Sequence, residues 1–268
     1  MVTDLDGTLL RSDATLSDYT VDVVRQALRS GIPVTYATAR SYQTASPLVA
    51  RLPLSLPAIV YNGAFVVAAD TGTHMVANWL DGGIAAQVLS EARRYGVVPF
   101  TLGFTGGREV LLHSAPQNAG QRSFLKKRHG DPRLIAVRNV QLPEQVIELL
   151  FAAPRGDLTG LFDWVESRLA GLVSVSLTRD VYCDGCYQLE IYHPHANKRD
   201  MLRWIARHLG VALSTVTVFG DGENDLPMFE IAGRRVAVAN AHPEVLRHAD
   251  HVVASNDNDG VARYIESL

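Results

Sequence analysis

The sequence predicts an α/β protein in which a parallel, doubly wound sheet is interrupted by an inserted α+β domain. Short apolar segments alternate with helical patterns at both ends of the chain, up to residue 61 and again from residue 198. Between these ends, apolar segments flank tight turns, which is typical of antiparallel pairing. Because strands that alternate with helices form parallel sheets covered by helices, we expect the two ends to form one domain together.

The N-terminal part should contain three parallel strands connected by helices. Ser17 is a suitable N-cap for the first helix, whose apolar positions are spaced by three or four residues until Gly31 ends it. A second helix is expected to begin near Ser41. The three strands are predicted at residues 1–5, 32–37 and 58–61.

The pattern changes after Asn62-Gly63, where hairpin signals replace the α/β alternation. Strands are predicted at residues 64–69, 74–79, 98–104, 109–113, 146–152, 172–177 and 187–192, and helices at 83–95, 117–129 and 158–169. We therefore expect an inserted α+β domain over residues 80–192.

From Lys198 the parallel pattern returns. The expected elements are a helix at 199–209, a strand at 215–220, a helix at 226–232, a strand at 236–239, a helix from Pro243 and a strand at 251–253. Residues 1–79 and 193–268 should thus form the catalytic α/β core domain.

Composition excludes several other classes of protein. The 268 residues are 47% hydrophobic and 20% charged, with a formal net charge of -3, so a sizeable core is possible and no basic footprint for nucleic acid is present. No apolar run approaches the roughly 20 residues that span a bilayer. We expect a soluble cytoplasmic protein. Only three residues precede Asp4, so either the first strand is short or the natural chain starts upstream of Met1.

The sequence contains one pair of cysteines and one pair of neighbouring histidines that could bind a metal, but each pair is too small for a complete metal site. Cys183 and Cys186 are half the ligand set of a structural zinc site, but Asp184-Gly185 between them is a hairpin turn signal, so we expect the thiols on facing strand ends. His193 and His195 are compatible with a substrate contact or a metal site; a polar loop is the preferred interpretation.

Acidic residues follow two of the predicted core strands. Asp4 and Asp6 lie on the same side of the chain, and Asp221 and Asp225 come after the apolar strand at residues 216–219. If these strands are neighbours, all four carboxylates meet at the carboxyl edge of the sheet, where open α/β sheets bind ligands. Crowded carboxylates favour a hard cation, and magnesium suits an all-oxygen site. The alternative is that each Asp-Gly pair merely forms a turn.

These residues resemble the four motifs of the haloacid dehalogenase superfamily, in the same order. The first motif is Asp4-Leu5-Asp6-Gly7-Thr8, the second contains Thr38, the third is Lys198, and the fourth is Gly220-Asp221-Gly222-Glu223-Asn224-Asp225. The insertion between the second and third motifs, together with Asn62-Gly63-Ala64, is similar to the Cof-type branch. One departure is Ala39, where the family often has glycine.

The resemblance implies a Rossmann-like core, an inserted cap that selects the substrate, and a magnesium-dependent phosphatase. Asp4 would be the nucleophile and Asp6 the general acid and base. Thr38, Lys198 and Asn224 would bind the phosphoryl group, and Lys198 would also assist catalysis. Magnesium would be held by Asp4, Asp6 through its backbone carbonyl, and Asp221, with support from Asp225. The substrate expected from the resemblance is a small phosphorylated metabolite, most often a sugar phosphate.

Two other functions use the same residues. A sugar phosphomutase or phosphotransferase would pass the phosphoryl group from the aspartate back to a sugar. A non-catalytic sensor of a phosphorylated ligand has no chemical need for Asp4 and Asp6 together. A dinucleotide-binding domain is disfavoured because no Gly-x-Gly-x-x-Gly follows the first strand. The sequence gives no information on the oligomeric state.

Overall fold

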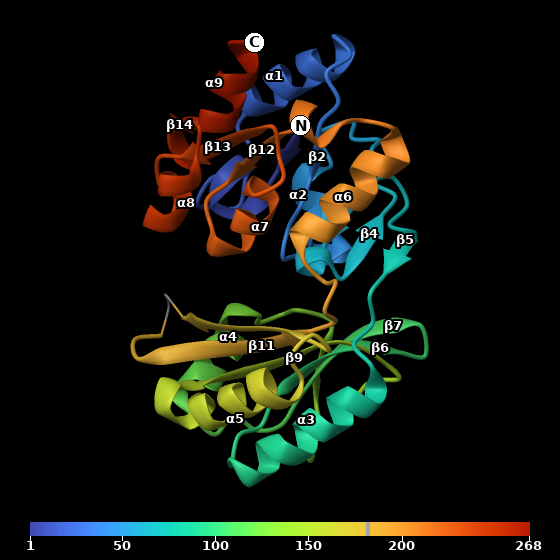
Figure 1. The fold of residues 1–268 in the computed structure, drawn as a ribbon, viewed down its shortest axis with the longest axis vertical. Coiled ribbons are helices and arrows are strands. Elements are labelled where there is room, and N and C mark those ends of the chain that lie inside the picture. The colour runs from blue at the N-terminus through green and yellow to red at the C-terminus, as the bar shows by residue number, and fades with distance from the viewer. Residues whose placement is uncertain (181–182) are drawn as a thin grey trace. The chain divides into compact units, whose positions relative to one another are not determined.

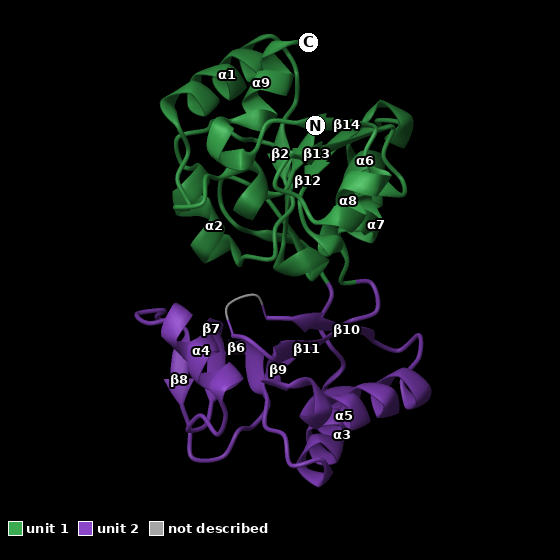
Figure 2. Ribbon diagram, turned by 90° about the vertical axis from the view of Figure 1, so that its left-hand side faces the viewer, with its two compact units in different colours: residues 1–77, 196–268 green, residues 78–195 purple. Residues whose placement is uncertain are grey.

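The computed structural model describes residues 1–180 and 183–268, which divide into two compact units (Figure 2). Unit 1 comprises residues 1–77 and 196–268, and unit 2 comprises residues 78–195. Unit 1 has the predicted α/β fold with a parallel sheet, and unit 2 contains a mainly antiparallel sheet. Figure 1 labels the helices and strands.

A five-stranded parallel sheet forms the centre of unit 1. Its order is β14-β13-β12-β1-β2, with bounds β1 Val2–Thr3, β2 Thr35–Tyr36, β12 Thr217–Gly220, β13 Arg234–Val238 and β14 His251–Val253. Thr3 lies opposite Phe219 on one side and Tyr36 on the other. Since β1 is flanked by β12 and β2, the residues that follow these three strands meet at one edge of the sheet.

Helices cover both faces of this sheet, as expected for a doubly wound arrangement. Their bounds are α1 Asp18–Arg29, α2 Tyr42–Val49, α6 Lys198–Leu209, α7 Leu226–Phe229, α8 Pro243–His248 and α9 Gly260–Glu266. In Figure 2, α1, α2 and α9 lie on one face and α6, α7 and α8 on the other. The caps explain the starts of the helices: Ser17 accepts a hydrogen bond from the Thr20 N–H, and Ser41 does the same for Thr44.

A small antiparallel sheet extends unit 1 beyond β2. It consists of β3 Ala58–Val60, β4 Phe65–Val67 and β5 His74–Ala77, and a parallel bridge between Ala37 and Ile59 attaches β3 to the end of β2. Shorter turns connect the main elements at Leu5–Leu9, Tyr61–Gly63, Leu213–Thr215, Glu223–Asp225 and Asn256–Asn258.

The sheet of unit 2 has the order β10-β11-β9-β6-β7-β8. The strands are β6 Phe100–Thr105, β7 Arg108–His113, β8 Leu134–Ala136, β9 Gln145–Pro154, β10 Ser174–Arg179 and β11 Cys186–Tyr192. All neighbouring pairs are antiparallel except β7 and β8. Successive side chains of a strand point to opposite faces, and β9 is buried along its length because helices cover both faces of the sheet there.

Three helices pack on this second sheet. The apolar face of β9 and β11, with Leu149 and Ile191, is buried under α3 Gly82–Arg94 and α5 Arg155–Arg168. On the opposite face, α4 Ala119–Lys127 stacks Phe124 on Phe100 of β6, with ring centroids 4.1 Å apart. Unit 2 therefore has its own hydrophobic core between the sheet and two helices.

The structure differs from the expected elements at a few places. Strand β1 covers only Val2–Thr3 because the chain turns at Leu5, whose carbonyl accepts a hydrogen bond from the Leu10 N–H. Helix α7 ends at Phe229, three residues early. The sequence did not predict β8, a short and mostly exposed strand, or α9. None of the helices in the described residues is long and apolar enough to cross a membrane.

Candidate active site

Asp4 lies where β1 ends, between the neighbouring strands β12 and β2. Its backbone N–H donates to the carbonyl of Phe219, which continues the pairing with β12. The side chain of Asp4 is buried, and its Oδ1 accepts a hydrogen bond of 2.7 Å from Nζ of Lys198. The sheet therefore holds this carboxylate at a fixed position beside a cation.

Lys198 is the first residue of α6, and Asn197 caps that helix by accepting a hydrogen bond from the Asp200 N–H. The Lys198 ammonium also donates to Oδ1 of Asp225 at 2.6 Å, and its side chain is completely shielded from solvent. Burial alone would lower the pKa of Lys198, but the two carboxylates outweigh that effect and raise the pKa above its usual value. Lys198 is thus a permanent positive charge between two acids.

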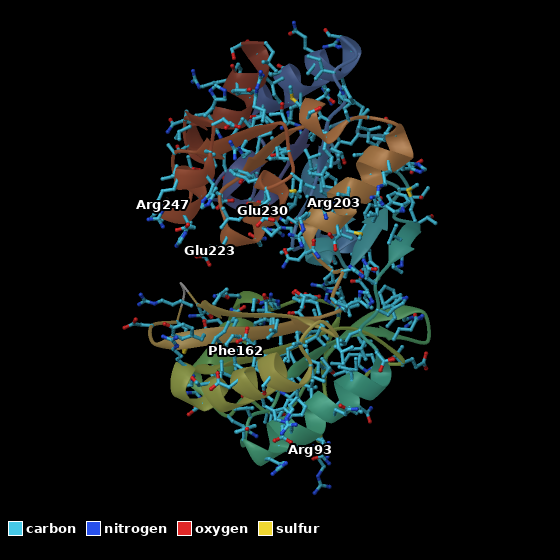
Figure 3. The ribbon with its side chains drawn as sticks, in the orientation of Figure 1. Arg93, Phe162, Arg203, Glu223, Glu230 and Arg247 are labelled. Atoms are coloured by element: carbon cyan, nitrogen blue, oxygen red, sulfur yellow. A yellow bond between two sulfur atoms is a disulfide. The ribbon has the colours of Figure 1, made fainter. Side chains whose placement is uncertain are left out.

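The loop after β12 supplies the other two acids. Asp225 uses Oδ2 to accept hydrogen bonds from the N–H groups of Asp221 and Gly222. Asp221 is fixed in turn by the Thr8 hydroxyl, which donates to its Oδ1 at 2.6 Å. Glu223, labelled in Figure 3, belongs to the same short turn as Asp225. These bonds order the acidic loop against the chain that follows β1.

Close approach explains two glycines at this edge. A side chain at Gly7, whose φ is 74°, would meet Oδ2 of Asp221 at 2.5 Å. A side chain at Gly220 would meet Cβ of Asp225 at 2.6 Å. Glycine is required at both positions because the carboxylates lie directly against the backbone.

The site concentrates negative charge. Burial raises the pKa of Asp4 well above its usual value, and the charges of Asp225 and Asp221 add to this effect while Lys198 opposes it. Burial likewise raises the pKa of Asp221 to about 6. Burial is the main cause of both shifts because it disfavours the ionised form of each carboxyl group, and a bound cation would offset that cost.

A divalent cation fits this group of acids. One carboxylate oxygen each from Asp4, Asp221 and Asp225 lies within 4.8 Å of the others. Within the described residues, Oδ1 of Asp4 and Oδ1 of Asp221 have hydrogen-bond donors, which leaves the second oxygen of each for a ligand. An all-carboxylate donor set suits hard cations such as magnesium or calcium.

Asp6 lies apart from this buried group. Its side chain is half exposed, and both of its oxygens accept hydrogen bonds from Arg40, at 2.7 Å from Nε and 2.5 Å from Nη2. The sequence analysis did not identify Arg40. The arginine is visible in the motif Thr38-Ala39-Arg40, but only the fold shows that it reaches the first motif.

Thr38 and Asn224 occupy two further loops at this edge. Thr38 follows β2, and its Oγ1 accepts a hydrogen bond from the Arg40 N–H at 3.1 Å. Asn224 is exposed and donates from Nδ2 to Oδ1 of Asn62 at 3.0 Å. Thr38 and Asn224, two of the three residues predicted to bind phosphate, are thus hydrogen-bonded to residues of loops at this edge. Asn62, which the sequence analysis did not identify, is the partner of Asn224.

The turn Tyr61–Gly63 joins several of these loops. Its first two N–H groups donate to the carbonyls of Arg40 and Thr38 at 2.9 and 3.0 Å. Tyr61 and Asn62 both adopt the left-handed region, with φ of 50° and 51°, and Gly63 has φ of 101°. A strained conformation at non-glycine residues is retained where surrounding contacts fix it.

The cysteines and histidines do not join the acidic group. Cys186 begins β11, whereas Cys183 lies in the turn before it rather than on a facing strand, and the two are joined by a disulfide. His193 accepts a hydrogen bond at Nδ1 from the His195 N–H within the loop after β11. In the described part of the chain, the one candidate metal-binding cluster is the carboxylate group of Asp4, Asp221 and Asp225.

Comparison with known proteins decides the family. The family model described as haloacid dehalogenase-like hydrolase matches residues 1–265. The chain belongs to this family. Its four motifs coincide with the residues that unit 1 brings to the carboxyl edge of the sheet.

Relatives of this hydrolase carry phosphatase names. It is 28% identical to 5-amino-6-(5-phospho-D-ribitylamino)uracil phosphatase YitU of Bacillus subtilis over 98% of this chain and 94% of the relative. It is also 28% identical to the HMP-PP phosphatase of Serratia proteamaculans, over 98% and 92% of the two chains. The hydrolase is therefore an enzyme that acts on phosphoric monoesters.

Solved structures agree with the fold. A haloacid dehalogenase-like hydrolase from Bacteroides thetaiotaomicron superposes with a TM-score of 0.79 and 26% identity, covering 99% of this chain and 97% of the other. The hydrolase belongs to the Cof-type branch expected from its inserted domain.

We predict that Gly63→Ala reduces both stability and activity of this hydrolase. The new Cβ would overlap the backbone of Asn197, which caps the helix that begins with Lys198, and the positive φ adds strain. The expected loss is about 2–4 kcal/mol in the free energy of unfolding. Gly31→Ala is the control, because Gly31 also has a positive φ of 81° but has no atom within 4 Å of the added carbon. Equal losses in denaturant titrations of the two variants would contradict the contact with Asn197.

Proposed function

We propose that the protein is a magnesium-dependent phosphatase that hydrolyses a small phosphorylated metabolite through an aspartyl phosphate on Asp4. The observation that carries this proposal is the buried Asp4 carboxylate, bonded to Lys198 and within ligand distance of Asp221 and Asp225. A nucleophile beside a permanent cation and a group of carboxylates suits phosphoryl transfer, which depends on positioning and charge neutralisation.

In the first step, the free oxygen of Asp4 would attack phosphorus while the bond to the ester oxygen breaks. Asp6 would donate its proton to that oxygen, so the alcohol leaves neutral. In the second step, Asp6 would take a proton from water as the water oxygen attacks the phosphorus of the aspartyl phosphate. Cleavage of the phosphorus–oxygen bond to Asp4 then releases inorganic phosphate and restores both carboxyl groups.

The other predicted residues would hold the phosphoryl group and the cation. Lys198 donates a hydrogen bond to the proposed nucleophile, Asp4. Thr38 and Asn224 are both hydrogen-bonded to Asn62 in the turn after β3. Magnesium, bound by Asp4, Asp221 and the backbone carbonyl of Asp6 with support from Asp225, would neutralise charge on the phosphate.

A sugar phosphate is the proposed substrate class, with phosphorylated cofactors as the next class to test. The names of two relatives refer to different small phosphorylated molecules, 5-amino-6-(5-phospho-D-ribitylamino)uracil and HMP-PP, and so support this broad class. A panel of such compounds, assayed for release of inorganic phosphate, would identify the substrate. Release of free phosphate rather than a transferred phosphoryl group also separates a phosphatase from a phosphomutase.

We predict that Asp4→Asn lowers kcat by about four orders of magnitude or more, because the amide retains the shape but loses the nucleophilic oxygen. Asp6→Asn should also be severely impaired and should accumulate acyl phosphate if loss of the base slows hydrolysis more than formation. Asp13→Asn, in an exposed loop of the same unit, is the control. Phosphate release by the Asp4 variant at a rate near that of the parent would identify another nucleophile.

Removal of metal should abolish turnover, and protons should compete with magnesium. Asp221 must be ionised to bind the cation, and its pKa is raised to about 6, so binding strengthens as the pH rises through 6. Below that pH, the apparent dissociation constant should increase by about tenfold per pH unit from this group. Magnesium-dependent thermal stabilisation at pH 5 to 8 measures this effect without an activity assay. Full turnover after exhaustive chelation would exclude a metal requirement.

Unit 2 is proposed to select the substrate, because every proposed catalytic residue belongs to unit 1. We predict that replacing residues 78–195 by a short Gly/Ser linker lowers discrimination between esters more than it lowers turnover of a small generic ester. Circular dichroism would first establish that unit 1 still folds. If the shortened protein keeps the parent's ratio of kcat/KM values for the two kinds of ester, the specificity residues lie in unit 1.

A further inference from the structure

Arg40 and Asp6 form an ion pair with two hydrogen bonds at the carboxyl edge of the sheet. The guanidinium contacts both carboxylate oxygens, at 2.7 and 2.5 Å, in the parallel arrangement that arginine makes with carboxylates. In this arrangement both oxygens of Asp6 already accept hydrogen bonds from the arginine. A carboxylate that accepts both hydrogen bonds from an arginine is ionised and carries no proton for a leaving group.

The backbone of Arg40 is fixed, although its side chain is partly accessible. Its N–H donates to Thr38, and its carbonyl accepts a hydrogen bond from the N–H of Tyr61 in the strained turn. The side chain of Arg40 is 29% exposed, compared with 0% for Lys198. The guanidinium can therefore change partner by rotation of its side chain while the loop stays in place.

Charge and geometry favour a phosphate as the other partner. The Lys198 ammonium is already shared between Asp4 and Asp225, so much of its charge is neutralised. The backbone N–H of Arg40 donates to Oγ1 of Thr38 at 3.1 Å, so the arginine belongs to the same loop as a proposed phosphate-binding residue. Its pKa is raised, first by its hydrogen bonds to Asp6. The planar fork of arginine fits two phosphoryl oxygens as well as it fits two carboxylate oxygens.

We propose that Arg40 is a phosphate-binding residue that exchanges Asp6 for the phosphoryl oxygens of the substrate. This exchange rests on the proposed phosphatase activity and adds a step to it: arrival of the phosphate releases the ionised Asp6 carboxylate, which then takes up a proton from solvent and can pass that proton to the ester oxygen. Asp6 and the substrate compete for the same guanidinium, so the acid is set free only when a phosphoryl group is bound.

The test uses inorganic phosphate as the probe, in the full-length protein with magnesium. Arg40→Ala should weaken phosphate binding by about tenfold or more, measured by titration calorimetry and as product inhibition. Arg40→Lys should recover part of this loss. Arg235→Ala is a matched control, because Arg235 makes the same two-bond pair with Asp250, at 3.0 and 2.5 Å, at the start of β14.

The decisive comparison is with Asp6→Asn. If Asp6 competes with phosphate for Arg40, the Asp6→Asn variant binds phosphate more tightly than the parent, and this gain disappears in the double variant Asp6→Asn/Arg40→Ala. A gain that persists in the double variant reflects only the loss of a negative charge and overturns the exchange. Unchanged phosphate affinity in Arg40→Ala overturns it as well, because the arginine then acts only as a support for Asp6. Failure of the proposed function itself would be recognised separately, as normal turnover by Asp4→Asn.

Discussion

The buried Lys198 ammonium is the constraint on which the active edge of unit 1 depends. A charge without solvent contact must be neutralised by bonded partners, and Asp4 and Asp225 are those partners. Loss of Lys198 would leave both buried carboxylates without their cation, a kind of change that costs about 3–5 kcal/mol. Because one cation faces two carboxylates and Asp221 lies within ligand distance, the group retains excess negative charge. That excess negative charge favours the binding of a divalent cation at this group.

The backbone around this charged group is packed so closely that several positions have no room for a side chain. Gly7 and Gly220 bring main chain against the carboxylates of Asp221 and Asp225, and Gly63 brings the turn after β3 against Asn197. Asn240 adds a fourth connection by donating to the carbonyl of Gly7 at 2.8 Å. Segments from five parts of the sequence, around residues 7, 63, 197, 221 and 240, are therefore held in contact by glycines and asparagines that have no proposed catalytic role.

Much of this arrangement could be predicted from the sequence, because it depends on local signals. Ser17 and Ser41 begin helices, apolar strands precede Asp4 and Asp221, and parallel strands bring their carboxyl ends together. The pairing of Arg40 with Asp6 could not be predicted, since it depends on how two loops from different strands approach each other. The support of Asn224 by Asn62 depends in the same way on tertiary contact: Asn62-Gly63 indicates a turn but does not show which loop that turn contacts. Strand β8 and helix α9 were missed because each is short and has little periodicity.

The split of unit 1 along the chain has a consequence for synthesis on the ribosome. Unit 2 is one continuous segment, so all strands of its sheet have been made when residue 195 leaves the ribosome. Strand β1 must wait for β12, its neighbour on one side, until nearly the whole chain has been translated. Throughout that interval β1 presents an open edge, the kind of surface that pairs with other chains. A product that ends before residue 217 therefore lacks the strand that covers this edge of β1, whereas its middle segment already has every strand of its own sheet.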